Sequence, residues 1–562
     1  MTVRALTWSL LLWLATTALA CFAVSRAFAI RADGATGRIV ASVWSHGQII
    51  ARAVLASVAE QAPALDAALA SHPGATRVDE CIVGEGLVAT RPIAAFSMSL
   101  VPGRDGLKIT LDGRTEYLTP DELLARQAYD RGINIAGLGL TAGLDAELAL
   151  AVLAERFRIP VTDLLDRGKF RRFRALRSIP GASPPRVITA ETMTEDDVRN
   201  GAVAAARFLA RGVDAEGRFR YLVDAPTNRT LSGYDWPRHA GATYFLAQSA
   251  ALLDDAQINW ATLRAASQLR DHAMVECGDN RCIGSDRIVD VGSTALAVIA
   301  FAEIAKTKLD PAYALVVPGL TAFLRAQQRS DGEFMHQYDR SERRPIDVQF
   351  LYYSGEAALA LSRAHSLLHA PADLDAASRA LARLIGPGWS FFGSRYYFGE
   401  EHWTCQATDD LWDRAPNPNA LDFCLRWQAF GRKLQYEAGE TPYDAEGGYG
   451  LGPLVTPRLT PVGSRSEAGI ATLNAARRAG SRPGELSTLE LQMRRSLALL
   501  LRHQFRPGLR HLLAEPDAVE GAMPASQVDW QLRIDFAQHT GSALVRWLSL
   551  RSPERGDEKE QR

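Results

Sequence analysis

From Thr194 onward the sequence alternates between helical segments and loops, and this alternation most constrains what the chain can fold into. The helical period of its apolar residues marks eleven segments, the first at Glu195–Arg211 and the last at Gln538–Arg551. The loops between them are rich in Gly, aromatic and acidic residues and show little strand pattern. A region of this kind is mainly α and buries its apolar faces by packing helix on helix.

Two of the loops echo one another. Asp214, Gly217 and Phe219 follow one helix, and the stretch Asp331-Gly332-x-Phe334 follows another. In each of them an acidic residue precedes a Gly that allows a tight backbone turn, and the aromatic side chain that follows packs against the helix pair. A repeated hairpin that buries its face only against its neighbours is what a ring or solenoid of helical pairs requires.

Four motifs then carry a resemblance to a known superfamily. They are Arg238-His239-Ala240-Gly241-x-x-Tyr244, Gly292-Ser293-Thr294-Ala295-Leu296-Ala297, Gln328…Asp331-Gly332-x-Phe334 and Tyr352-Tyr353-x-Gly355-Glu356-Ala357. Residues 194–550 resemble the (α/α) toroids, which include six-hairpin glycosidases, polysaccharide lyases, sugar epimerases and terpenoid cyclases. The resemblance implies a toroid of helical hairpins, and it leaves the chemistry open because several enzyme classes share these motifs.

The sequence predicts four parts of the chain. We expect a membrane segment or signal at 1–30, a small α+β domain with a linker at 31–190, the toroid at 191–551 and a charged, disordered tail at 552–562.

Within the α+β domain the pattern predicts a helix over 49–69 and strands over 81–90, 96–101 and 107–111. Thr119 and Pro120 mark the start of a further helix.

The basic run Arg167–Arg177 in the same domain allows two interpretations, an anion-binding patch or a solvated helix face. The second is favoured because most charge runs have no specific ligand.

A charge-free run of 21 residues, Ala5–Ser25, is long enough to cross a bilayer as a helix. Its length favours a retained signal anchor, while Ala27-Phe28-Ala29 offers a cleavage site for a secretory signal. Cys21 after Leu19-Ala20 offers a third interpretation, a lipoprotein site, which Ala18 disfavours. All three interpretations predict a periplasmic or other extracytoplasmic protein, held to the inner membrane by the N-terminal helix or secreted after cleavage.

Six cysteines fit that compartment, because disulfides form in oxidising environments. Cys277 and Cys282 flank a four-residue turn and are the first pair expected to bridge, and Cys405 and Cys424 are the second. We predict no metal site and no cofactor, since no second cysteine pair or histidine stands at zinc-ligand spacing.

The charge balance bears on partners. The chain has 63 basic and 64 acidic residues, a net charge of -1, so no general attraction to nucleic acid is expected. The expected partners are a polysaccharide or glycan and the membrane, and the sequence does not determine the oligomeric state.

Four clusters of polar and aromatic residues stand where inner helices of a toroid begin. In the first, Tyr234, Asp235, Trp236, Arg238 and His239 precede or open one helix. Aromatic faces stack on sugars and Arg pairs with carboxylates, whereas the alternative is an Asp235 helix cap with a core histidine.

The second cluster is Tyr352, Tyr353 and Glu356, with the carboxylate on the first turn of an apolar helix. That position suits a general acid, a general base or a structural anchor.

The third cluster is Glu400, Glu401, His402 and Trp403, in which the two adjacent carboxylates would raise the pKa of one of them; the alternative is an exposed loop with a capping box. The fourth cluster is Tyr449, Arg465 and Glu467 around a long Gly/Pro loop, for which a surface excursion with a helix cap is the alternative.

Together these clusters predict an exported, envelope-associated, glycosidase-like enzyme that acts on a polysaccharide or glycan. Two carboxylates would flank the scissile bond, and we expect them among Glu356, Glu401, Asp235 and Glu467. The sequence does not choose the pair. Substrate would lie in a cleft lined by Tyr234, Trp236, Tyr352, Tyr353, Trp403 and Tyr449.

Two other functions stay open. A polysaccharide lyase or uronate epimerase would use histidine or tyrosine as base and Arg238 to hold a carboxylate, with candidates His239, His402, Tyr244 and Tyr353. A non-catalytic periplasmic scaffold or glycan-binding module is the third. Nucleophile-elbow, phosphate-loop and H-E-x-x-H motifs are absent from the sequence.

Overall fold

The computed structural model describes residues 37–57, 59–129, 132–135, 138–141, 143–183, 186–387, 402–441, 444–450, 456–505 and 507–551. The chain separates into two compact units, Met1–Pro184 and Pro185–Arg562. The predicted N-terminal segment and charged tail lie outside the described residues. Among the residues that are described, no helix is long and apolar enough to cross a membrane.

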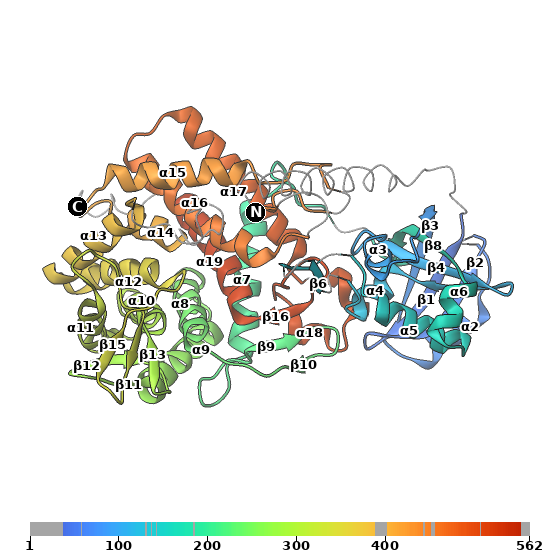
Figure 1. Ribbon diagram of the computed structural model, residues 1–562, viewed down its shortest axis with the longest axis horizontal. Helices are drawn as coiled ribbons and strands as arrows, with labels where there is room; N and C mark the ends of the chain where they lie inside the picture. The colour runs from blue at the N-terminus through green and yellow to red at the C-terminus, as the bar shows by residue number, and fades with distance from the viewer. Residues whose placement is uncertain are drawn as a thin grey trace, which may run out of the picture. The chain divides into compact units, whose positions relative to one another are not determined.

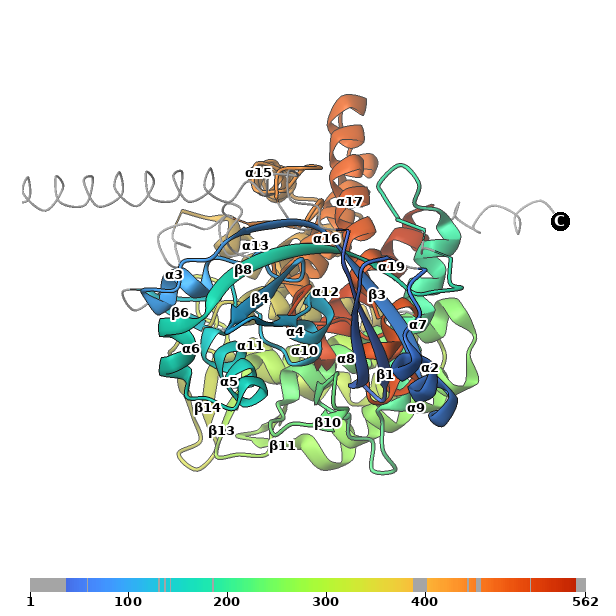
Figure 2. The ribbon, with the colours of Figure 1, turned by 90° about the vertical axis from the view of Figure 1, so that its right-hand side faces the viewer.

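The first unit is an antiparallel sheet with helices packed on it. The strand order is β2-β1-β3-β8-β4-β5, and α2 lies beside β1 and β3 (Figure 2). The strands are β1 (Ile39–Ser45), β2 (Gln48–Leu55), β3 (Thr76–Leu87), β4 (Asp105–Leu111), β5 (Arg114–Leu118) and β8 (Lys169–Ser178). The other elements are α2 (Pro63–Ser71), α3 (Ile93–Ser97), α4 (Pro120–Ala125), the hairpin β6 (Gly132–Ile135) and β7 (Leu138–Thr141), α5 (Ala146–Phe157) and α6 (Val161–Arg167).

Two of the predicted elements in this unit are wrong. Residues 49–69 do not form one helix, because Gln48–Leu55 pairs with β1 and only Pro63–Ser71 is helical. Residues 96–101 are not a strand, and Ile93–Ser97 forms the short helix α3. Short apolar runs fit both periods, and strand pairing decided between them. The helix predicted at Thr119 is confirmed, since the Thr119 side chain accepts a hydrogen bond from the Glu122 amide at 3.3 Å.

The basic run is also different from the prediction, because it forms β8 in the interior of the sheet. Arg172 is 1% exposed and, with Arg174, donates to the buried Asp105 carboxylate. Arg177 pairs with Asp121 at 3.0 Å. These guanidinium groups are neutralised by acids of the same unit, so the run is neither a helix face nor a free anion-binding patch.

The second unit is a toroid of six helical hairpins, built within the described residues from twelve helices (Figure 1). The six inner helices are α8 (Trp236–Leu253), α10 (Val291–Lys306), α12 (Tyr353–Leu368), α14 (His402–Leu411), α16 (Leu459–Arg478) and α19 (Ile534–Arg551). The six outer helices are α7 (Glu195–Arg211), α9 (Ala256–Gln268), α11 (Val317–Gln327), α13 (Pro371–Ile385), α15 (Pro418–Arg432) and α17 (Pro483–His503). Of these twelve helices, sequence periodicity missed only α14, which follows directly on residues that the structure does not describe. It also missed the four-residue helix α18 (Pro516–Val519).

The division into inner and outer helices follows the distribution of apolar residues. Nearly every residue of α10 is buried, as expected for a helix packed on all sides. In α13 only one face is buried. Each inner helix packs on the next in chain order, and α19 packs on α8, which closes the ring.

Ring closure depends on a close helix contact and on strand pairing. A side chain at Gly541 of α19 would overlap the ring of Phe245 in α8. Strand β16 (Gln531–Arg533), just before α19, pairs with β9 (Leu222–Asp224) near the start of the unit. The two ends of the toroid are therefore held together by both backbone and side-chain packing.

The sequence echo is confirmed, and the structure adds a third copy. Gly217, Gly332 and Gly447 all have positive φ, and each lies two residues before a buried aromatic side chain. A Cβ at any of them would overlap a backbone carbonyl of the next outer helix. Gly is required at each turn because the outer helices approach one another there.

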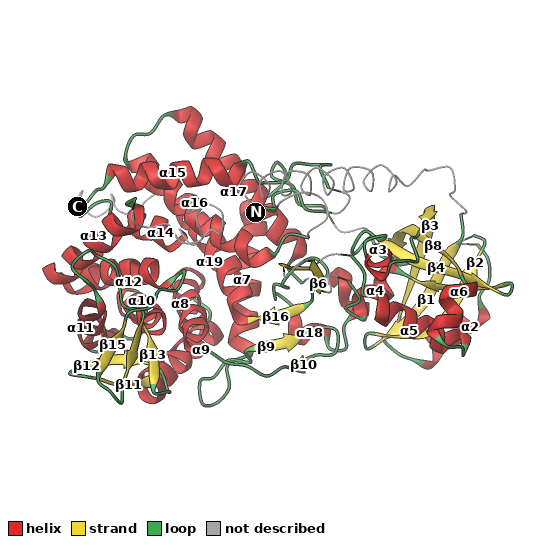
Figure 3. Cartoon of the chain, viewed as in Figure 1, coloured by secondary structure: helices red, strands yellow, loops and turns green. Residues whose placement is uncertain are grey.

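Short strands and two disulfides complete the unit. The remaining strands, drawn as small arrows in Figure 3, are β10 (Arg229–Thr230), β11 (Met274–Cys277), β12 (Asn280–Ile283), β13 (Ile288–Asp290), β14 (Gln337–Asp339) and β15 (Arg344–Ile346). The predicted disulfides are both present. Cys277 bonds Cys282 across the β11–β12 hairpin, and Cys405 bonds Cys424 between α14 and α15.

The buried Asp105 carboxylate gives a stability prediction for the first unit. Asp105→Ala should lower its free energy of unfolding by about 3–5 kcal/mol, because two arginines would lose their buried partner. Asp166→Ala is the matched control and should cost less than about 1 kcal/mol, because its pair with Arg91 is exposed. Hydrogen exchange of β4 and β8 in urea, measured on the full chain, reports both values. Equal effects would contradict the assignment of Asp105 as the central ion-pair partner.

Candidate functional site

The N-termini of all six inner helices meet at one cavity of about 910 Å³. The two helices of each hairpin are antiparallel, and inner and outer helices alternate along the chain. All six inner helices therefore point in the same direction, and their N-termini lie at the same end of the toroid. The helix-start residues that line the cavity include Asp235, Arg238, Asp290, Tyr352, Tyr353, Glu356, His402, Trp403, Arg458, Asp535 and His539.

Two aspartates each cap an inner helix and also line the cavity. Asp235 caps α8 by accepting from the Arg238 amide at 3.0 Å, and Asp290 caps α10 by accepting from the Ser293 amide at 2.6 Å. Both also line the cavity. For Asp235, the cap and the cavity position that the sequence offered as alternatives therefore hold together.

Glu356 is the most perturbed carboxyl group of the cavity. It is 5% exposed, and its Oε2 atom is buried without a hydrogen-bond partner. Burial raises its pKa to about 8, and the negative charge of Asp290 adds to the shift. At neutral pH Glu356 is therefore a protonated acid in the wall of a cavity.

The groups around Glu356 respond to the same environment. Burial raises the pKa of Asp290 to about 6, so at pH 7 this carboxyl group is mostly ionised. Burial, reinforced by Asp290 and Glu356, also raises the pKa of the Tyr353 hydroxyl well above its usual range. Tyr353 is therefore a neutral hydrogen-bond donor rather than a base.

The arginines of the cavity are paired with the protein's own acids. Arg238 contacts Asp235 and lies 3.3 Å from Asp535, and Arg458 lies 2.6 Å from Asp529. Arg533 likewise pairs with Asp535 at 2.6 Å. The cavity consequently carries no excess of basic side chains.

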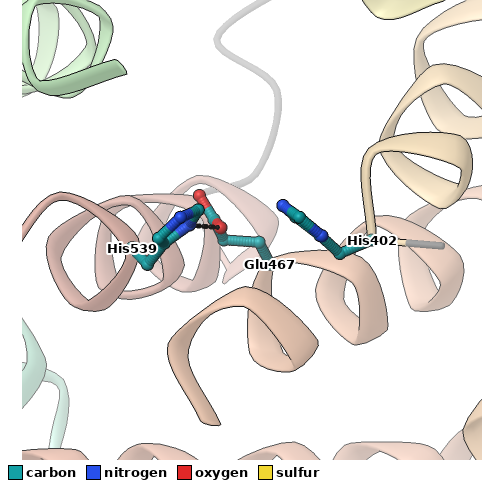
Figure 4. A group of neighbouring side chains, drawn as sticks. All are labelled: His402, Glu467 and His539. Carbon is teal, nitrogen blue, oxygen red and sulfur yellow. Dashed lines mark hydrogen bonds and ion pairs between the residues drawn. The ribbon is translucent and has the colours of Figure 1, made fainter. Parts of the chain in front are cut away.

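A second group of titratable residues comes from three inner helices. His402, Glu467 and His539 point toward one another from α14, α16 and α19 (Figure 4). His539 Nδ1 lies 2.6 Å from Glu467 Oε2. Burial disfavours the charged imidazole, but the Glu467 carboxylate outweighs it and raises the pKa of His539.

Aromatic rings extend this group along the cavity wall. The His402 ring lies 4.7 Å from the Trp403 ring and 6.0 Å from that of Tyr352, measured between centroids. Tyr352 is 43% exposed. His402 and Trp403 are each 3% exposed, so Tyr352 is the ring of this group that offers a face on which a sugar could stack.

The structure brings seven of the predicted site residues together at the cavity, and Glu467 lies behind it on His539. Two others belong to the core. His239 is buried, Tyr234 donates to its Nδ1 at 2.6 Å, and its Nε2 donates to the Ala265 carbonyl at 2.9 Å. Burial lowers the pKa of His239 to about 4, so this imidazole is neutral.

Three further predicted residues within the described part of the chain also lie away from the cavity lining. Tyr449 is the buried aromatic of the third repeated turn, and the Arg465 guanidinium stacks on its ring. The Trp236 indole donates to the Ser285 hydroxyl at 3.2 Å. Glu401 lies outside the described residues.

Sequence reasoning missed Asp290 and His539. Asp290 directly precedes the apolar helix that begins Gly292-Ser293, which is the same signal that singled out Asp235. His539 follows Gln538 on the first turns of the last helix, where polar residues among apolar ones mark the cavity side. Both would have been found by applying one rule to every inner helix start.

No protein-family model matches the chain, and no curated protein matches it. Among solved structures, D-mannose isomerase matches with a TM-score of 0.51 and 12% identity, covering 66% of this chain and all of that one. The chain has the (α/α) toroid fold. A sugar epimerase from a ruminal bacterium matches at 0.49 and 10%, covering 64% and 100% of the two chains. An unsaturated glucuronyl hydrolase specific for heparin matches at 0.45 and 11%, covering 63% and 98%.

Gly292 gives a test of the packing around Glu356. A Cβ at this position would overlap the Tyr353 ring and lie 2.7 Å from Glu356 Oε2. Gly292→Ala should therefore destabilise the toroid by about 1–3 kcal/mol. Gly484→Ala, at an open helical position, should be neutral or stabilising by up to about 1 kcal/mol. Thermal unfolding followed by circular dichroism compares the two, and a neutral Gly292→Ala would contradict the close contact.

Proposed function

We propose that this chain is a carbohydrate-active enzyme, a glycoside hydrolase that binds a glycan in the toroid cavity. The raised pKa of the buried Glu356 carboxyl group is the observation that supports the proposal. Glycosidic cleavage needs a carboxylic acid that keeps its proton at neutral pH, and burial gives Glu356 that property. The fold, shared with D-mannose isomerase, supports a sugar as the ligand.

Asp290 and Glu356, the two carboxyl groups of the cavity with raised pKa values, have opposite protonation states near neutral pH. Between about pH 6 and pH 8, Asp290 is ionised while Glu356 is protonated. Glu356 would donate its proton to the leaving oxygen, and Asp290 would act as the base toward water. Tyr353, neutral and adjacent to both, would donate a hydrogen bond to the sugar.

The cavity also suits the proposed ligand in size and charge. Its volume of about 910 Å³ is at the upper end for small-ligand sites, which fits a few sugar units better than a bare monosaccharide. Tyr352, which is 43% exposed, provides a stacking face. Because the arginines are paired internally, a neutral sugar is favoured over a uronate.

A second candidate, a sugar epimerase or isomerase, is supported by a different observation. The Glu467–His539 pair orients one imidazole, and a second imidazole, His402, lies beside it on the same cavity. Such a pair suits proton abstraction from carbon followed by reprotonation. Export and membrane anchoring remain predictions from residues 5–25.

Replacing Glu356 tests the hydrolase directly. Glu356→Gln should lower kcat at least about 100-fold with little change in KM, because the amide fills the same space but has no proton to transfer. Release of reducing ends from a panel of neutral oligosaccharides measures the effect. Glu216→Gln, on the exposed surface, is the matched control and should retain full activity.

The same panel distinguishes the alternatives. Deuterium incorporation from D2O into an unshortened sugar, abolished by His539→Ala but kept by Glu356→Gln, would show an epimerase or isomerase instead. Binding of oligosaccharides without any turnover would indicate a non-catalytic module. Hydrolysis unaffected by Glu356→Gln contradicts the assigned acid.

The pH profile of hydrolysis follows from the same two groups. Activity should fall below about pH 6, as Asp290 gains a proton, and above about pH 8, as Glu356 loses one. Measuring kcat/KM from pH 4 to pH 10 tests this bell shape. A profile whose alkaline limb lies near pH 5 would show that Glu356 is not the acid.

A further inference from the structure

We propose that His402, Glu467 and His539 bind one divalent transition-metal ion of the zinc type. Each residue offers one ligand atom, and the three atoms lie within 4.8 Å of one another. They come from α14, α16 and α19, three consecutive inner helices, and their side chains converge (Figure 4). This site departs from the sequence prediction, which expected no metal.

The ligand set selects the class of ion. Two imidazole nitrogens and one carboxylate oxygen are typical of open zinc sites, which keep a fourth position for water or substrate. Mg²⁺ and Ca²⁺ instead take sets made of oxygen atoms. The three residues stand far apart in sequence, so no short spacing motif announces them.

Glu467 supplies a second, independent indication of a ligand. Its side chain has no exposed surface, and it uses Oε2 for the contact with His539. Its Oε1 atom is buried without a hydrogen-bond partner. A buried carboxylate oxygen without a partner is costly, and a bound cation would satisfy it.

The geometry needs only small adjustments to hold such an ion. Tetrahedral bonds of about 2.0–2.1 Å place ligand atoms roughly 3.3 Å apart. The His539–Glu467 contact of 2.6 Å would open slightly, and His402 would move in through side-chain rotation. The ion would then replace the proton that His539 and Glu467 share.

The position of the site suggests what the ion does. His402 and His539 line the cavity while Glu467 lies behind them, so the free coordination position would face the cavity. An ion there would polarise a sugar oxygen. This role rests on the proposed function, whereas binding of the ion does not.

Metal binding by the full chain tests the proposal without any substrate. The purified protein, stripped with a chelator, is titrated with ZnCl2 by calorimetry, and Co²⁺ is added separately for its visible spectrum. We expect one Zn²⁺ per chain with a Kd below about 1 μM, a tetrahedral Co²⁺ spectrum, and a higher melting temperature with Zn²⁺.

Variants locate the ion. His402→Ala and Glu467→Gln should each weaken Zn²⁺ binding by at least about 100-fold, and His272→Ala, an exposed histidine of the same unit, should leave it unchanged. If Glu467→Gln fails to fold by circular dichroism, His402→Ala decides. Absence of one-to-one binding by the wild type, or equal binding by wild type and His402→Ala, overturns the proposal and leaves the Glu356 assignment intact.

Discussion

The fold depends on one constraint, the direct packing of the last inner helix on the first. Gly541 of α19 lets Phe245 of α8 approach, and β16 pairs with β9 beside this contact. A ring that did not close would leave the apolar faces of two inner helices in water. Closure also brings every inner helix start to the same cavity, so the candidate site is a direct result of the architecture.

Two opposing effects act on the acids at these helix starts. A helix N-terminus favours a negative charge, which suits the caps Asp235 and Asp290. Burial disfavours that charge, and at Glu356 burial prevails even though the residue lies on the first turn of α12. Two acids at neighbouring helix starts, the cap Asp290 and the first-turn residue Glu356, thus acquire different protonation states, which is what acid and base chemistry requires.

The sequence was informative where a pattern is local and repeated. Helical periodicity and the repeated acidic-Gly-x-aromatic turn predicted a ring or solenoid of helical pairs, because each hairpin obeys the same packing rules, and the resemblance to the (α/α) toroids implied the closed ring. It failed where tertiary pairing decides, as in Gln48–Leu55 and the arginine run of β8.

The site shows the same division. Glu356 and Asp235 could be chosen from their places at predicted helix starts, and His402 from its cluster with Glu401 and Trp403, although the helix α14 was not predicted. The pairing of Glu467 with His539 could not, because these residues are 72 positions apart and meet only when α16 packs on α19. His239 and Tyr449 resembled ligand-binding residues because aromatic and polar side chains at these turns also serve packing.

Glu356 holds a proton at neutral pH inside a cavity open to ligand, and the proposed hydrolysis depends on that proton. Infrared difference spectroscopy between the wild type and Glu356→Gln, recorded across pH, measures it most directly. We expect a protonated-carboxyl carbonyl band at pH 7 that disappears with a midpoint near pH 8. A band that disappears between about pH 4 and pH 5, as for an ordinary glutamate, would show that Glu356 is ionised at neutral pH and is not the acid.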